Sequence, residues 1–300
     1  MKLFTSIFLS LLLPLAVVAQ SVQIQDGAIL AEFSVSDSTK VYFSQGNLQY
    51  QASTNMWRFA EHQWDFVGDS INGNVYENGV KSDNLKISPT YDGWIDLFGW
   101  GTSGWNSGAN AYQPYSTSRD YRDYFPGGSI FNNLTGSYAN ADWGMYNKIS
   151  NGGNQAGQWR TLTYNEWSYL ISGRAQANRL MGQGRVNNVN GLILLPDGWE
   201  TPSSVKFTYD PGNYSTNVYS QDEWAVMQSY GAVFFPAAGE RLGAGVDGVG
   251  SYGNYWSSSG NYGSDAAYLY FYSYYVYADY DGSSGRYYGR SVRLVQDVKK

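Results

Sequence analysis

Short alternations of hydrophobic and polar residues run through the first quarter of the chain. The runs lie at residues 32–36, 41–43, 48–50, 57–59 and 64–66. Alternation with a period of two residues is typical of strands that bury one face, and turn residues separate these runs. The pattern therefore predicts a series of short strands, followed by a polar loop at residues 70–92.

Two capping boxes, at residues 163–166 and 220–223, predict the starts of two helices. Each box is followed by a tryptophan and by further apolar residues at helical spacing, at 167–171 and 224–227. Gly231 is placed to end the second helix. These are the only two segments whose pattern favours a helix strongly.

Two apolar runs, at residues 192–195 and 233–235, are each followed by proline and predict buried strands. Because short strands outnumber helices, the pattern predicts an α+β fold with many loops. No break in composition divides the chain. We therefore expect a single domain over residues 31–300, preceded by a short leader at residues 20–30.

The first 19 residues predict a secretory signal peptide. Lys2 provides the positive start, residues 7–18 are apolar, and Ala19 is a suitable small residue before the cleavage point. The apolar run is too short for a comfortable membrane span, and no later segment resembles one. We therefore expect an exported protein of the periplasm, the cell surface or the extracellular space, with no direct membrane span.

The net charge and the absence of cysteine exclude some partners and some covalent modifications. The net charge is −6, only 15% of the residues are charged, and no basic stripe is visible, so nucleic acid is not expected as a partner. The chain has no cysteine, which excludes disulfides and a thioether lipid anchor. Stability must come from the core, which 300 residues can supply.

The segment 252–290 holds 12 of the 28 tyrosines, separated mostly by Ser, Gly, Asn, Asp and Ala. Antibody-like contact surfaces use this alphabet, because Tyr supplies stiff amphipathic area and the small residues supply adaptable hydrogen bonds. Leu269 and Phe271 alternate with tyrosines, which predicts a strand with its tyrosines facing outward. The alternative is a tyrosine-rich strand pair in an ordinary core.

The expected ligand-binding surface is made by residues of this segment and by the returning strand after it. The candidate residues are Asn254, Asn261, Tyr262, Asp265, Tyr268, Tyr270, Tyr272, Tyr274, Tyr275, Tyr277, Asp279, Asp281, Tyr287, Tyr288 and Arg290. We expect no cofactor and no metal in this surface. Oxygen-rich loops at 69–74 and 279–283 leave a calcium site open, although neither has the ligand spacing of an EF-hand.

An ordered set of motifs carries a family resemblance. The motifs are WRTLTYNEWSYL at 159–170, GLILLPDGW at 191–199, DEW at 222–224, GAVFFPAAGER at 231–241, YWSS at 255–258 and RSVRLV at 290–295. In this order they resemble the C-type lectin fold, in its formylglycine-generating-enzyme-like (sulfatase-modifying factor) branch. The resemblance covers roughly residues 31–297 and implies that fold.

Within that branch, the chain resembles the variable proteins of diversity-generating retroelements, of the type found in Bacteroidales. There, a reverse transcriptase copies a template with errors at adenines, which varies a cassette near the end of the gene. The resemblance implies that residues 252–290 are such a cassette. It also implies a binding protein whose partner is a surface protein or glycan of another cell or a phage.

The enzymes of this branch provide the competing hypothesis. The copper oxidase that makes formylglycine uses two cysteines, and the related sulfoxide synthases bind iron through several histidines, whereas this chain has no cysteine and only His62. We therefore expect no enzyme. The alternatives are a non-variable carbohydrate-binding or adhesive (fimbrial) module and, more remotely, a glycoside hydrolase. The candidate carboxylates for hydrolysis are Asp65, Asp96, Asp142 and Glu166.

Overall fold

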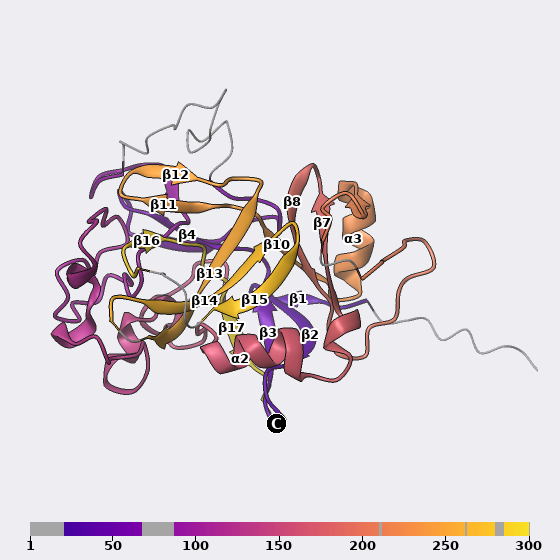
Figure 1. The fold of residues 1–300 in the computed structure, drawn as a ribbon, viewed down its shortest axis with the longest axis horizontal. Helices are drawn as coiled ribbons and strands as arrows, with labels where there is room; N and C mark the ends of the chain where they lie inside the picture. The colour runs from indigo at the N-terminus through magenta and orange to yellow at the C-terminus, as the bar shows by residue number, and fades with distance from the viewer. Residues whose placement is uncertain (1–20, 68–86, 210–211, 262, 280–284, 300) are drawn as a thin grey trace, which may run out of the picture.

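The computed structural model describes residues 21–67, 87–209, 212–261, 263–279 and 285–299. Within these residues, five small sheets and three short α-helices form a mixed α+β, loop-rich fold (Figure 1). The expected α+β class is therefore confirmed. The predicted signal peptide, the calcium candidate at 69–74 and most of the one at 279–283 lie outside the described residues.

Four of the five sheets are antiparallel throughout, and each has three or four strands. The first sheet has the order β1 (Ile24–Gln25), β2 (Ala28–Ser34), β3 (Lys40–Ser44), β17 (Val295–Asp297), and the second β5 (Met56–Phe59), β4 (Leu48–Gln51), β6 (Trp94–Ile95). The third has the order β12 (Gly245–Asp247), β11 (Glu240–Leu242), β16 (Tyr288–Gly289), and the fourth β13 (Tyr252–Gly260), β14 (Ala266–Tyr272), β15 (Tyr275–Asp279). The fifth has the order β10 (Val233–Pro236), β8 (Val189–Leu194), β7 (Met181–Val186), β9 (Asn217–Tyr219), in which β9 pairs parallel to β7.

The helices are short. They are α1 (Trp143–Tyr146), α2 (Tyr164–Ser168) and α3 (Gln221–Ser229), with 3₁₀ turns η1 (Tyr121–Tyr124), η2 (Pro126–Gly128), η3 (Gly136–Ala141) and η5 (Ala177–Arg179). A π-helical turn, η4 (Tyr169–Gly173), continues α2. Both predicted capping boxes are present, at the starts of α2 and α3, and these helices begin where the sequence predicts.

Most strand predictions are confirmed, but two expectations are wrong. Residues 64–66 form no strand. Trp64 lies in a turn, which is held by hydrogen bonds from the His62 amide to the Asp65 carboxylate and from the Gln63 side-chain amide to the Ala232 carbonyl. Residues 24–30, expected in a leader, belong to the domain instead. There, β1 pairs with the start of β2, and the Ile29 side chain is fully buried, so this segment closes the edge of the first sheet.

Two aromatic clusters form most of the core. In one, Phe43, Trp167 and Phe235 pack together between the first sheet, α2 and the fourth sheet. In the other, tryptophans from separate loops and strands gather around Phe98 and Trp143. The core therefore supports the fourth sheet from beneath, and in Figure 1 α2 lies below β15 and β17.

Candidate ligand-binding surface

The tyrosine-rich segment folds into the fourth sheet, and its register places the tyrosines on one face. Asn254 pairs with Tyr270, and Tyr270 pairs with Tyr277, so the three lie in one row across β13, β14 and β15. Tyr272 lies between Tyr252 and Tyr275 in the next row. Because side chains alternate along strands, these rows project to the same side.

The opposite face of the same sheet is core. Leu269 and Phe271 are fully buried, as predicted, and so is Tyr255. The Tyr255 hydroxyl donates a hydrogen bond to the Pro236 carbonyl at 2.9 Å. Gly253 lies opposite Phe271, and a Cβ at Gly253 would collide with the Phe271 ring. The sheet is therefore held on its inner side by close packing.

The outer rings contact one another and form a continuous phenolic surface. We name it the tyrosine face and define it as Tyr252, Tyr270, Tyr272, Tyr274, Tyr275 and Tyr277. Its ring centroids are separated by 5.3 Å for Tyr270–Tyr277, 5.4 Å for Tyr275–Tyr277, 5.7 Å for Tyr272–Tyr274 and 6.0 Å for Tyr252–Tyr270. These separations are typical of favourable tilted and edge-to-face aromatic pairs.

Exposure is concentrated at the β14–β15 turn. Tyr274, Tyr275 and Tyr277 are 71%, 46% and 39% exposed, whereas Tyr270 and Tyr272 are partly covered by their neighbours. Burial, with a further contribution from the nearby Tyr275 and Tyr277 phenols, raises the pKa of Tyr270. The Tyr270 phenol therefore stays neutral at physiological pH, and a neutral hydroxyl can both donate and accept a hydrogen bond.

The turn itself is fixed by a residue from another sheet. The Gln183 amide, on β7, donates to the Tyr272 carbonyl at 2.8 Å and to the Tyr275 carbonyl at 3.4 Å. Tyr214 donates its hydroxyl to the Ser251 carbonyl at 2.9 Å, close to the start of β13. These contacts restrain the hairpin that presents the most exposed tyrosines.

Three predicted binding residues are not exposed. Arg290 is only 3% exposed, and its guanidinium lies 3.6 Å from the Tyr268 ring centroid and 4.6 Å from that of Trp256. Asn254 and Tyr268 are also buried. The expected exposure of these three residues is wrong, because segments 239–242 and 288–291 lie against this end of the sheet and cover it.

Arg290 and its neighbours form a closed cation–aromatic cluster. An Arg290 terminal amine donates to the Glu240 carboxylate at 3.2 Å, which neutralises its charge. Tyr288 lies beside Arg290, at 5.5 Å, and stacks on Tyr287 at 4.7 Å. Tyr287 and Tyr288 are partly exposed and flank the covered end of the sheet. This cluster anchors β16 to the fourth sheet.

The remaining predicted residues are dispersed. Asn261 and Asp265 lie at the β13–β14 turn, where the Asn261 amide donates to the Asp265 carbonyl at 3.0 Å, at the opposite end of β14 from Tyr272. The Asp279 backbone ends β15, and Tyr262 and Asp281 lie outside the described residues. Tyr252, which the sequence analysis did not include, belongs to the face through its contact with Tyr270. The signal that could have found it was its alternation with Asn254.

The carboxylates considered for hydrolysis have structural partners. Asp142 is buried and accepts the Gly144 and Thr161 amides at 2.9 and 2.8 Å. Glu166 caps α2 and accepts two hydrogen bonds from Arg160, at 2.8 and 2.7 Å. Asp96 accepts the Val67 amide at 2.8 Å. These contacts fix the carboxylates as parts of the scaffold.

In the described part of the chain, His, Asp and Glu side chains form no group of three that could hold a metal ion. The same residues contain no helix with the length and apolarity needed to cross a membrane.

Comparison of the chain with protein-family models, curated proteins and solved structures finds no match.

Proposed function

We propose that this protein is an exported binding protein that recognises a macromolecular partner, a surface protein or glycan, through the tyrosine face. One observation carries the proposal. Six tyrosines form a contiguous, partly exposed surface on a sheet whose other side is fully packed. Clustered exposed aromatic side chains with hydrogen-bonding tips are typical of interfaces, where a few such anchors supply most of the affinity.

The shape of the surface favours a macromolecule over a metabolite. The exposed tyrosines are spread along two strands and the turn between them, so they present a broad area. A metabolite is normally enclosed in a concave pocket. The Arg290 charge is already neutralised by Glu240, so neutral contacts should dominate recognition.

We further propose a C-type lectin fold and a variable segment of the retroelement type. The order of motifs along the chain supports the fold, and the restricted alphabet of residues 252–290 supports the variation. Burial refines which positions can vary. Tyr272, Tyr274, Tyr275 and Tyr277 can change without opening the core, whereas Asn254, Tyr268 and Arg290 belong to the scaffold and Tyr270 packs against a core cluster.

We also propose that the protein is not an enzyme. Backbone or arginine groups donate hydrogen bonds to Asp142, Glu166 and Asp96, and the His62 amide donates to Asp65 Oδ2. His62 stacks on Trp64 at 4.7 Å. These contacts support a structural role for the four candidate carboxylates and for His62, in place of the acid–base pair that glycoside hydrolysis uses.

The test is an exchange of surface residues. Tyr272, Tyr274, Tyr275 and Tyr277 are replaced together by a Ser/Asn set, and both proteins are screened against displayed surface proteins and a glycan array. The exchanged protein should keep its unfolding transition and lose every partner of the native protein. Equal binding of the same partners by the folded exchanged protein would place recognition elsewhere. A matched control exchanges the exposed residues Tyr121, Tyr146 and Tyr209, which lie outside the face.

A further inference from the structure

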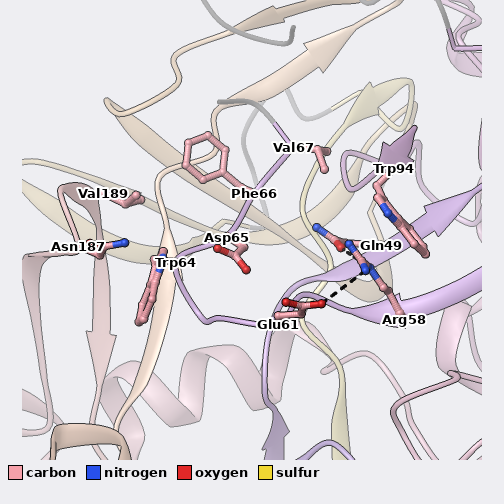
Figure 2. A pocket seen from close by; sticks show the side chains of 10 residues that line it. All are labelled: Gln49, Arg58, Glu61, Trp64, Asp65, Phe66, Val67, Trp94, Asn187 and Val189. Atoms are coloured by element: carbon pink, nitrogen blue, oxygen red, sulfur yellow. Dashed lines mark hydrogen bonds and ion pairs between the residues drawn. The ribbon is translucent and has the colours of Figure 1, made fainter. Parts of the chain in front are cut away.

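A polar pocket lies on other elements and shares no residue with the tyrosine face. Its volume is about 420 Å³, within the range of small-ligand sites. Its residues come from the second sheet, from the turn after β5 and from the β7–β8 hairpin (Figure 2). They are Gln49, Arg58, Glu61, Trp64, Asp65, Phe66, Val67, Trp94, Asn187 and Val189.

Arg58, on β5 of the second sheet, has terminal amines that can donate hydrogen bonds to a ligand. Gln49 and Arg58 are cross-strand partners, and Arg58 Nε donates to Gln49 Oε1 at 2.9 Å. The Arg58 guanidinium also lies 3.7 Å from the Trp94 ring centroid. Arg58 Nη1 and the Glu61 carboxylate form a loose ion pair at 3.9 Å (Figure 2), which is too long for a hydrogen bond. Within the described residues, neither terminal amine of Arg58 therefore has a hydrogen-bond acceptor.

The turn that forms the opposite wall is rigid. The buried Gln63 amide donates to the Ala232 carbonyl at 3.1 Å, and Gln63 Oε1 accepts the Phe234 amide at 2.6 Å and an Arg293 amine at 3.0 Å. The His62 amide donates to the Asp65 carboxylate at 2.9 Å, and the His62 ring stacks on Trp64. The pocket therefore exists before any ligand arrives, which reduces the entropy lost on binding.

The mixture of charges selects the class of ligand. A simple anion would be attracted by Arg58 but repelled by Glu61 and Asp65. A simple cation would leave the Arg58 amines without an acceptor. A hydroxyl group both donates and accepts, so a pair of neighbouring hydroxyls can use the guanidinium and a carboxylate at the same time. The aromatic rings of Trp64, Phe66 and Trp94 line the pocket and supply apolar contact for the carbon skeleton.

We propose that this pocket binds a neutral pyranose, as a second recognition site that is independent of the tyrosine face. Arg58 and Asn187 donate to sugar oxygens, and Glu61 and Asp65 accept from sugar hydroxyls. In Figure 2, the Arg58, Glu61 and Asp65 side chains all lie around the same hollow, with Trp94 on one side and Trp64 on the other.

Saturation-transfer NMR with the methyl pyranosides of glucose, galactose, mannose and N-acetylglucosamine tests the proposal. At least one of them should show transfer to the native protein. Arg58→Gln should weaken that sugar at least about tenfold, because it removes charge-assisted hydrogen bonds. The exposed Arg122, paired with Asp120, provides the control, and Arg122→Gln should bind as the native protein does.

Two further variants keep the test interpretable if Arg58→Gln loses stability. Glu61 is 73% exposed on its side chain, so Glu61→Ala should fold normally and still weaken the sugar. Tyr277→Ser should leave sugar binding unchanged, which separates this site from the tyrosine face. The proposal is overturned by no transfer from any of the four sugars, by unchanged affinity in folded Arg58→Gln and Glu61→Ala, or by full competition from acetate.

Discussion

On one side of the fourth sheet, Leu269 and Phe271 are fully buried against α2, whereas on the other side Tyr275 and Tyr277 are 46% and 39% exposed. The two sides are built from the same three strands and differ only in the parity of their residues. Both are largely apolar. Burial by a neighbouring element, and not hydrophobicity alone, therefore separates scaffold from contact surface in this segment.

A second contrast lies within the outer side. Near β11 and β16, Tyr268 and Arg290 are covered and form an interlocked cluster, whereas near the β14–β15 turn nothing in the described chain covers Tyr274. The same residue type is structural at one end and available for contact at the other.

The inner side should be the most sensitive to truncation. Leu269→Ala and Phe271→Ala should each lower the free energy of unfolding by about 2–5 kcal/mol, because they create cavities in a closely packed core. Chemical denaturation followed by tryptophan fluorescence measures this. Tyr277→Ser, on the adjacent strand, is the matched control from the outer side. A loss in Tyr277→Ser as large as that in Leu269→Ala would contradict the separation of the two sides.

Substitutions at the covered end of the fourth sheet, near β11 and β16, should lower the stability of the protein. Glu240→Gln removes the carboxylate that neutralises Arg290, and the guanidinium is then left buried with weaker partners. We expect the free energy of unfolding to fall by about 1–3 kcal/mol. Asp120→Asn, which breaks the exposed pair with Arg122, should leave the free energy of unfolding nearly unchanged. Equal effects of the two substitutions would contradict a structural role for the Arg290 cluster.

Substitutions at the exposed end of the fourth sheet, near the β14–β15 turn, should weaken binding and leave stability nearly unchanged. For a partner recovered by the exchange experiment, Tyr275→Ala should weaken binding by about 1–3 kcal/mol, since aromatic anchors supply much of the affinity of such interfaces. Calorimetry or surface plasmon resonance measures the change, and thermal unfolding should be nearly unchanged. Loss of stability together with affinity would mean that Tyr275 belongs to the scaffold.

Alkaline pH tests the burial of Tyr288, at the covered end. Burial, aided by the neighbouring Tyr287, raises the pKa of Tyr288 from 10.0 to about 12. A phenol whose pKa is raised in the folded state contributes stability that is complete below pH 10.0 and is lost as the pH rises toward 12. Tyr288→Phe should therefore reduce the fall in unfolding free energy across this interval. An identical fall in both proteins would contradict the assignment.

Local sequence signals predicted much of this architecture. The capping boxes fixed the starts of α2 and α3, and the alternation of Leu269 and Phe271 with tyrosine identified the inner side of β14. These features depend on residues close together in the chain. The burial of Tyr268 depends instead on Arg290, which stacks on its ring, and on Glu240, which pairs with Arg290. Both residues are far from Tyr268 in the sequence. Alternation along a strand predicts which face of the sheet a side chain lies on, but it does not predict which other segments pack over that face.

The smallest expected effect is at the β14–β15 turn, where Tyr274 is the most exposed tyrosine of the face. Tyr274→Ser removes a side chain that is 71% exposed and packs on the Tyr272 ring at 5.7 Å, so the free energy of unfolding should change by less than about 0.5 kcal/mol. Tyr268→Ser is the contrasting variant, because it removes a buried ring on which Arg290 stacks, and it should be clearly destabilising. Thermal unfolding of both variants side by side measures the difference. If they unfold at the same temperature, the distinction between a covered and an open end fails, and the proposed set of exchangeable positions fails with it.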